Sequence, residues 1–132
     1  MLELSELLHY RNTDVVNYFR HYHPEFSLQE AQVLFDDLLG WMWLNKQRIK
    51  HGKKTYLFGP LLILDKLWHA FILHTQDYMN FSIQYFGAYF HHNVEPIGFE
   101  HIMEEDELQD YLHDCFSYLG EEWVVRRFKE FL

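Results

Sequence analysis

The sequence lacks the features that would mark a secreted or membrane-bound protein. Cys115 is the only cysteine among 132 residues, so no disulfide can form within the chain. No apolar run reaches the roughly 18 residues of a membrane-spanning helix. The first ten residues, MLELSELLHY, have neither the basic start nor the apolar stretch of a secretion signal. We therefore expect a cytoplasmic protein that does not contact membranes.

The lone cysteine has two interpretations. A small buried side chain in a reducing compartment is the ordinary one. A nucleophile would need a base close by, and His113 is only two residues from Cys115. Residues two apart on a helix do not face each other, so this pair does not predict a catalytic thiol.

Basic residues are missing from nearly half of the chain. Between Leu67 and Val125 there is no lysine or arginine, whereas the same stretch holds eleven aspartates and glutamates. Five of the eleven basic residues are concentrated in residues 46–54, KQRIKHGKK. Nucleic-acid binding requires a broad basic surface, which this sequence does not offer. An acidic half favours a cation or a basic protein surface as a partner, and otherwise serves solubility.

The chain also lacks strand signals and common enzyme motifs. Sustained alternation of apolar and polar residues is absent, as are phosphate-binding glycine loops and the Gly-x-Ser-x-Gly nucleophile motif. Helical spacing is frequent instead, and the three prolines fall outside it. We predict an all-α, compact, bundle-like single domain over residues 1–132, with about six helices and short loops. The predicted helices cover residues 13–22, 27–51, 61–74, 76–86, 104–119 and 121–132.

Aromatic residues are plentiful, at 19% of the chain, and suggest a surface for a partner. The helix predicted over residues 27–51 opens with a capping box at Ser27 and Glu30, and its apolar stripe is widened by Trp43. Such a helix is either central or covered by a partner. A homodimer through the Trp41–Trp43 region is one possibility of this kind. The acidic run Glu104, Glu105, Asp106 and Glu107 could meet a basic partner, although a helix N-terminus also favours acids.

One apolar segment contains residues that could bind a metal. In LDKLWHAFILHTQDY, residues 64–78, Asp65 and His69 are four apart and share a helix face. His74 lies about 140° further around the helix, so it does not join them. A third ligand could come from FHHNVEP, where His91 and His92 are adjacent and at most one is expected to point toward the pair. Three such ligands would leave open positions on a divalent transition metal ion. The alternative is a hydrogen-bonded Asp–His pair that only holds helices together.

The same block resembles a known family. It is similar to the conserved block of the glycine-rich-domain-containing-protein-like family, in particular of its short bacterial members. The shared motifs are Asp-x-x-Trp-His, Ile-Leu-x-Thr-x-x-Tyr, an aromatic residue followed by glycine, and His-His. The closing segment at residues 119–128, LGEEWVVRRF, is similar to that family's last helix. The matching positions are Asp65, Trp68, His69, Ile72, Leu73, Thr75, Tyr78, Phe86, Gly87, His91 and His92. The resemblance implies a helical fold and no established activity, and it links the two histidine-bearing segments.

Two functions follow from these observations. The first is a small acidic protein-binding module, an adaptor or an inhibitor of another protein with a basic surface. The second is a metal-binding protein or small metalloenzyme that uses Asp65, His69 and His91 or His92. The sequence does not decide whether the chain is an enzyme and favours a binding role.

Overall fold

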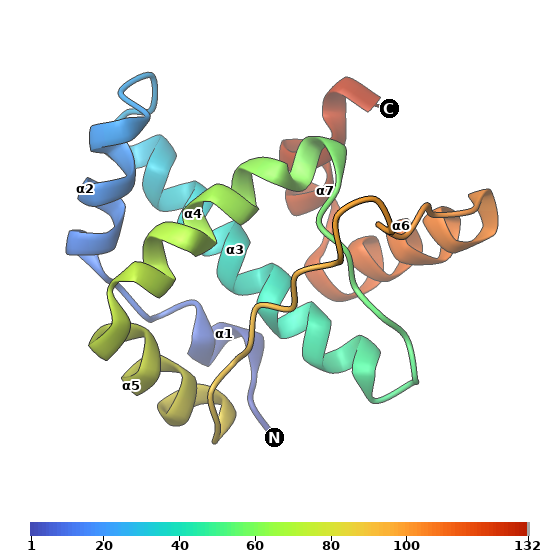
Figure 1. The fold of residues 1–132 in the computed structure, drawn as a ribbon, viewed down its shortest axis with the longest axis horizontal. Helices are drawn as coiled ribbons and strands as arrows, with labels where there is room; N and C mark the ends of the chain where they lie inside the picture. Colours follow the sequence, from blue (N-terminus) through green and yellow to red (C-terminus); the bar gives the residue numbers. More distant parts are fainter. Residues whose placement is uncertain (132) are drawn as a thin grey trace.

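The computed structural model describes residues 1–131, and within this range all regular structure is helical. Seven α-helices and two short 3-10 helices follow one another along the chain (Figure 1). The all-α prediction is therefore confirmed. The α-helices are α1 (Leu4–Leu7), α2 (Thr13–Tyr22), α3 (Leu28–Ile49), α4 (Leu62–Leu73), α5 (Thr75–Phe86), α6 (Glu105–Leu119) and α7 (Glu121–Phe128), and the 3-10 helices are Gly59–Leu61 and Lys129–Phe131.

Helix α3 is the centre of the molecule. It contacts α1, α2, α4 and α6, and more than half of its 22 residues are buried. The predicted capping box fixes its start, because the Ser27 hydroxyl accepts a hydrogen bond from the Glu30 N–H while the Glu30 carboxylate accepts one from the Ser27 N–H. Its wide apolar stripe is explained by neighbours on several sides. In Figure 1, α2 and α5 lie toward one end of the molecule and α6 and α7 toward the other, with α3 between them.

The aromatic residues are used largely inside the fold. Trp41 is 3% exposed, stacks obliquely on Trp68 and donates its indole N–H to the Tyr111 hydroxyl at 2.8 Å. Trp43 is partly buried, and its N–H donates to the Leu2 carbonyl at 3.0 Å. The Trp41 side chain is therefore already covered by the protein itself, and the homodimer through the Trp41–Trp43 region stays a prediction.

Two differences from the predicted architecture concern the connections. Helix α1 was not predicted, because its four residues are too few to show helical periodicity. The connections are not all short either, since residues 87–104 between α5 and α6 contain no helix. This long segment crosses α3 and packs against it at Phe90, whose ring lies 4.9 Å from the Lys46 ammonium.

Internal ion pairs tie the acidic second half of the chain to α3 and to the segment that follows it. Arg48 is nearly buried and lies 2.5 Å from the Asp114 carboxylate of α6, and Lys53 lies 3.0 Å from Asp110. Helix α3 is also paired with α7, because its buried Asp37 lies 2.7 Å from Arg126 and 3.0 Å from Arg127. Part of the charge segregation seen in the sequence is thus compensated within the fold. Over the described residues, no helix is both long and apolar enough to cross a membrane.

Candidate metal centre

The candidate site begins on α4, a helix with one strongly apolar face. Leu64, Leu67, Trp68 and Phe71 are buried against the core. Asp65 and His69 occupy positions one turn apart on the adjoining face, as their spacing predicts. The Asp65 side chain is 26% exposed and that of His69 is 56% exposed, so both reach the solvent side of the helix.

The third member, His92, arrives from the long segment after α5. Helix α5 ends at Gly87, whose φ of +76° reverses the chain at low cost because glycine has no Cβ. The returning segment is then fixed by Tyr78. Its hydroxyl accepts a hydrogen bond from Trp68 Nε1 at 2.9 Å and donates one to the Phe90 carbonyl at 2.6 Å. Burial raises the pKa of Tyr78 to about 12, so the hydroxyl keeps the proton that it donates.

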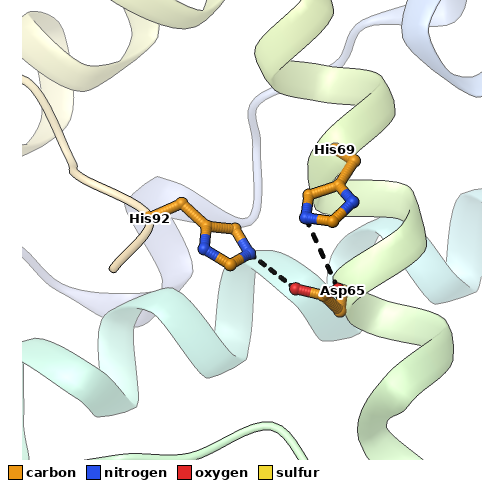
Figure 2. Close-up of side chains that lie close together, drawn as sticks. All are labelled: Asp65, His69 and His92. Atoms are coloured by element: carbon orange, nitrogen blue, oxygen red, sulfur yellow. Dashed lines mark hydrogen bonds and ion pairs between the residues drawn. The ribbon is translucent and has the colours of Figure 1, made fainter. Parts of the chain in front are cut away.

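The Asp65 carboxylate faces both imidazoles, one with each oxygen (Figure 2). His92 Nε2 lies 2.5 Å from Asp65 Oδ1, and His69 Nε2 lies 3.5 Å from Asp65 Oδ2. The two imidazole rings are 4.9 Å apart between their centroids. One ligand atom from each residue lies within 4.8 Å of the other two. Two histidine nitrogens and a carboxylate, contributed by α4 and the distant segment, thus converge on one point.

His92 is the most firmly held of the three. Its side chain is 16% exposed and its ring stacks on Trp68, with centroids 4.1 Å apart and planes at 29°. Its Nδ1 is buried and has no hydrogen-bond partner among the described residues. The ring is therefore oriented by stacking and by its Nε2 contact. His69 is the most exposed and the freest to rotate.

The arrangement suits a metal ion after a small movement. Ligands held about 2.0–2.2 Å from a tetrahedral ion are roughly 3.4 Å apart. The three ligand atoms lie within 4.8 Å of one another, and rotation of the exposed His69 ring can shorten the longest of these distances. The His92 Nε2–Asp65 Oδ1 distance of 2.5 Å would have to lengthen as the ion enters. Three ligands of this kind leave coordination positions open, which is typical of catalytic rather than closed structural sites.

A groove of about 1200 Å³ borders the site. Asp65 and His92 contribute to its wall, together with apolar side chains of α3, α4 and the segments around Phe58 and Phe99. The site is therefore beside a space large enough for a small molecule.

The structure places the other predicted residues away from this cluster. His91 is exposed, packs edge-on against Tyr89 and is not one of the converging ligands. Adjacent histidines in extended backbone point in opposite directions, so the inclusion of only one of them agrees with the sequence argument. Glu104, Glu105, Asp106 and Glu107 form the N-cap and first turn of α6. Glu104 and Glu107 close a capping box, and Glu107 also pairs with His101 at 2.7 Å.

Sequence reasoning named Tyr78 only as a matching position of the motif and expected Trp68 only to pack inward. Their hydrogen bond joins α4 to α5, two helices that follow each other at His74. The partner of Tyr78 is a backbone carbonyl, which a sequence pattern does not reveal. Cys115 is fully buried, and burial raises the pKa of its thiol to about 12, as a structural role requires.

The fold and the Asp/His cluster define a small all-helical protein with a candidate metal centre beside a groove. The chain belongs to the family described as UCP032817-like, which it matches over residues 7–122. This finding corrects the resemblance to the glycine-rich-domain-containing-protein-like family, which rested on short motifs covering about half of the chain. The family is uncharacterised, so it supplies no reaction. No curated protein and no solved structure matches the chain well enough to count as similar.

Proposed function

We propose that Asp65, His69 and His92 bind a divalent transition metal ion and that the protein functions as a small metal-binding protein. The observation that carries this proposal is the convergence of their three ligand atoms within 4.8 Å. The distance between these residues in the sequence also supports the proposal. His92 reaches α4 only because the segment after α5 folds back and is held there by hydrogen bonds. Two imidazoles and one carboxylate suit zinc, iron, cobalt or nickel better than the harder magnesium or calcium ions.

The proposed ion would carry a net positive charge. One aspartate neutralises one of its two charges, and neutral histidines neutralise none. The ion would border the groove, because Asp65 and His92 line it. A positive, incompletely coordinated ion next to a groove can orient or polarise a bound molecule, which leaves room for a metalloenzyme.

Metal titration tests the proposal. The purified protein is stripped with a chelator and then dialysed against zinc or cobalt, and bound metal is measured by elemental analysis. We expect about one equivalent for the wild type, and a higher melting temperature with metal than in chelator. Asp65→Asn should lower the affinity strongly. Less than about one-tenth equivalent, with the same melting temperature in chelator, would rule the site out.

A second function is supported by a different observation. Four large apolar side chains in one short segment are exposed: Val94 at 80%, Ile97 at 93%, Phe99 at 83% and Ile102 at 83%. Exposed apolar residues gathered in this way are typical of protein-binding surfaces. Exposed acids lie among them at Glu100 and just after them at Glu104, which favours a partner with a basic surface. An adaptor or inhibitor would bind its target here.

Substitutions in this segment test the second function. We expect Ile97→Ser/Phe99→Ser to abolish retention of a specific partner that the wild-type protein retains in a pull-down. Leu73→Ser, which changes an exposed apolar residue on α4, is the control. Retention of the same proteins by all three chains would argue against this surface.

A further inference from the structure

The groove beside the metal ligands has a composition that indicates one class of ligand. We infer that it binds a singly charged amphiphile, an oxygen-anion head group such as a carboxylate on an apolar body, with the head completing the coordination of the metal. This inference rests on the proposed metal site and adds the ligand that the site takes.

The first step is the position of the groove. Asp65 and His92, the two less exposed ligands, line it, whereas His69 does not. An ion held by all three would therefore face the groove from the side of Asp65 and His92. Open coordination positions on that side would be reached from the groove.

The second step is the character of the walls. Aromatic and aliphatic side chains from distant parts of the chain line the groove. Leu62 lies one turn before Asp65 on α4 and is half exposed. A volume of about 1200 Å³ with such walls accommodates an extended apolar body. The apolar lining residues that are at least half exposed are Ile49, Leu62, Val94, Ile97 and Phe99.

The third step is charge. The metal with one aspartate retains a positive charge, which attracts an anionic oxygen donor. The part of the groove wall formed by residues 87–104 is acidic, in contrast, because it includes Glu95 and Glu100. Their carboxylates accept hydrogen bonds from the His101 and Gly98 N–H groups and are thereby held in that wall. Lys54 also lines the groove, but the two glutamates outnumber it, so a second anionic group on the ligand would meet a wall of net negative charge. The ligand should therefore have one anionic end only.

Octanoate, octan-1-ol and acetate test this inference with the cobalt-loaded protein, because the visible absorption of cobalt reports its coordination directly. Octanoate has both the head and the body, octan-1-ol lacks the anion and acetate lacks the body. We expect octanoate, below its micellar concentration, to shift the cobalt band. It should bind at least about 100-fold more tightly than acetate, because each buried methylene contributes a factor of about four. Octan-1-ol should not shift the band, and the metal-free protein should bind octanoate at least about ten-fold more weakly.

Two variants locate the body of the ligand. Leu62→Ser should weaken octanoate binding at least about five-fold and leave cobalt and acetate binding unchanged. Leu73→Ser, at an exposed site outside the groove, should change none of the three. Cobalt binding with no response to octanoate, or equal affinity for octanoate and acetate, would overturn the inference and leave the metal site standing. Failure to bind cobalt at all would overturn both.

Discussion

Asp65 is the residue on which the site depends, because its two carboxylate oxygens face two different imidazoles. The sequence predicted its pairing with His69 from helical spacing alone. It also predicted that at most one of His91 and His92 would join them, but not which one. The choice depends on the register of the segment after Gly87, and the Tyr78 hydrogen bond to the Phe90 carbonyl sets that register. Backbone contacts of this kind leave no pattern in side-chain types.

Separate substitutions of His91 and His92 test which of the two adjacent histidines binds the metal. We expect His92→Ala to lower zinc affinity by more than about 100-fold, since loss of a ligand should cost more than loss of an outer partner. His91→Ala should leave the affinity within about two-fold, because His91 is exposed and outside the cluster. Equal effects of the two substitutions in equilibrium dialysis would contradict the assignment of His92 as the ligand.

Tyr78 should act as a positioning residue. Tyr78→Phe removes the hydroxyl that links Trp68 Nε1 to the Phe90 carbonyl, so both groups lose a buried partner. We expect a loss of about 1–3 kcal/mol in the free energy of unfolding and a 10- to 100-fold loss in zinc affinity. Urea unfolding and metal titration measure the two effects. Tyr22→Phe, at a 63% exposed position, is the control and should alter neither. Zinc affinity that is unchanged in Tyr78→Phe would show that the hydrogen bonds do not position the site.

At the scale of helices, the long amphipathic elements could be predicted and the connections could not. The capping box of α3 and its apolar stripe determine that helix locally, so its prediction needed no knowledge of its neighbours. Helix α1 is held by packing on α3, and the segment 87–104 by single contacts such as that of Phe90 with Lys46. The attachment of α6 to α3 likewise depends on Arg48 and Asp114, 66 residues apart.

The Arg48–Asp114 pair makes a prediction about that attachment. Its side chains are 6% and 12% exposed, and Arg48 also lies over the Tyr111 ring at 4.9 Å. Arg48→Met should cost less than the about 3–5 kcal/mol expected for a buried charge with no partner, because Lys53 Nζ still lies 3.5 Å from the Asp114 carboxylate. The double variant Arg48→Met/Asp114→Leu should recover part of this loss, since it removes the buried carboxylate but not the need of the Lys54 carbonyl for its Arg48 donors. Urea unfolding of the four proteins forms a double-mutant cycle. Additive losses would show that the two side chains are not coupled.

At the scale of the whole molecule, the composition predicted the fold class well and the use of the aromatic residues poorly. A surplus of rings indicated a partner surface, yet Trp41, Trp68 and Tyr111 lie in the core. Composition does not distinguish a buried ring from an exposed one. The net charge of −9 likewise does not show where the unpaired acids lie on the surface. Arg48, Lys53, Arg126 and Arg127 neutralise acids that lie far away in the sequence.

Acid should destabilise the molecule through several carboxylates. Hydrogen bonds from the Ser27 backbone, from His101 and from Lys53 lower the pKa of Glu30, Glu107 and Asp110, respectively. The unfolded chain therefore binds more protons than the folded one in this range, and stability rises with pH. This contribution is present above the unfolded pKa values of about 4 and is lost as the pH falls through the lower folded values. Burial raises the pKa of Asp36, which opposes the trend in part.

Urea unfolding between about pH 5 and pH 3 measures this dependence. Asp110→Asn should make the stability less dependent on pH over this interval, because it removes one of the carboxylates whose pKa folding lowers. Asp106→Asn changes an exposed acid of the same helix and should leave the slope closer to that of the wild type. An Asp110→Asn slope as steep as the wild-type slope would contradict the assignment.

The most direct test of the metal site is a crystal structure of the zinc-soaked protein with anomalous differences measured on both sides of the zinc absorption edge. We predict one strong peak within about 2.0–2.2 Å of a carboxylate oxygen of Asp65 and of ring nitrogens of His69 and His92. The peak should be absent from His92→Ala crystals and present in His91→Ala crystals. No peak at these three residues in the wild type, or a peak bound by His91 in place of His92, would contradict the account.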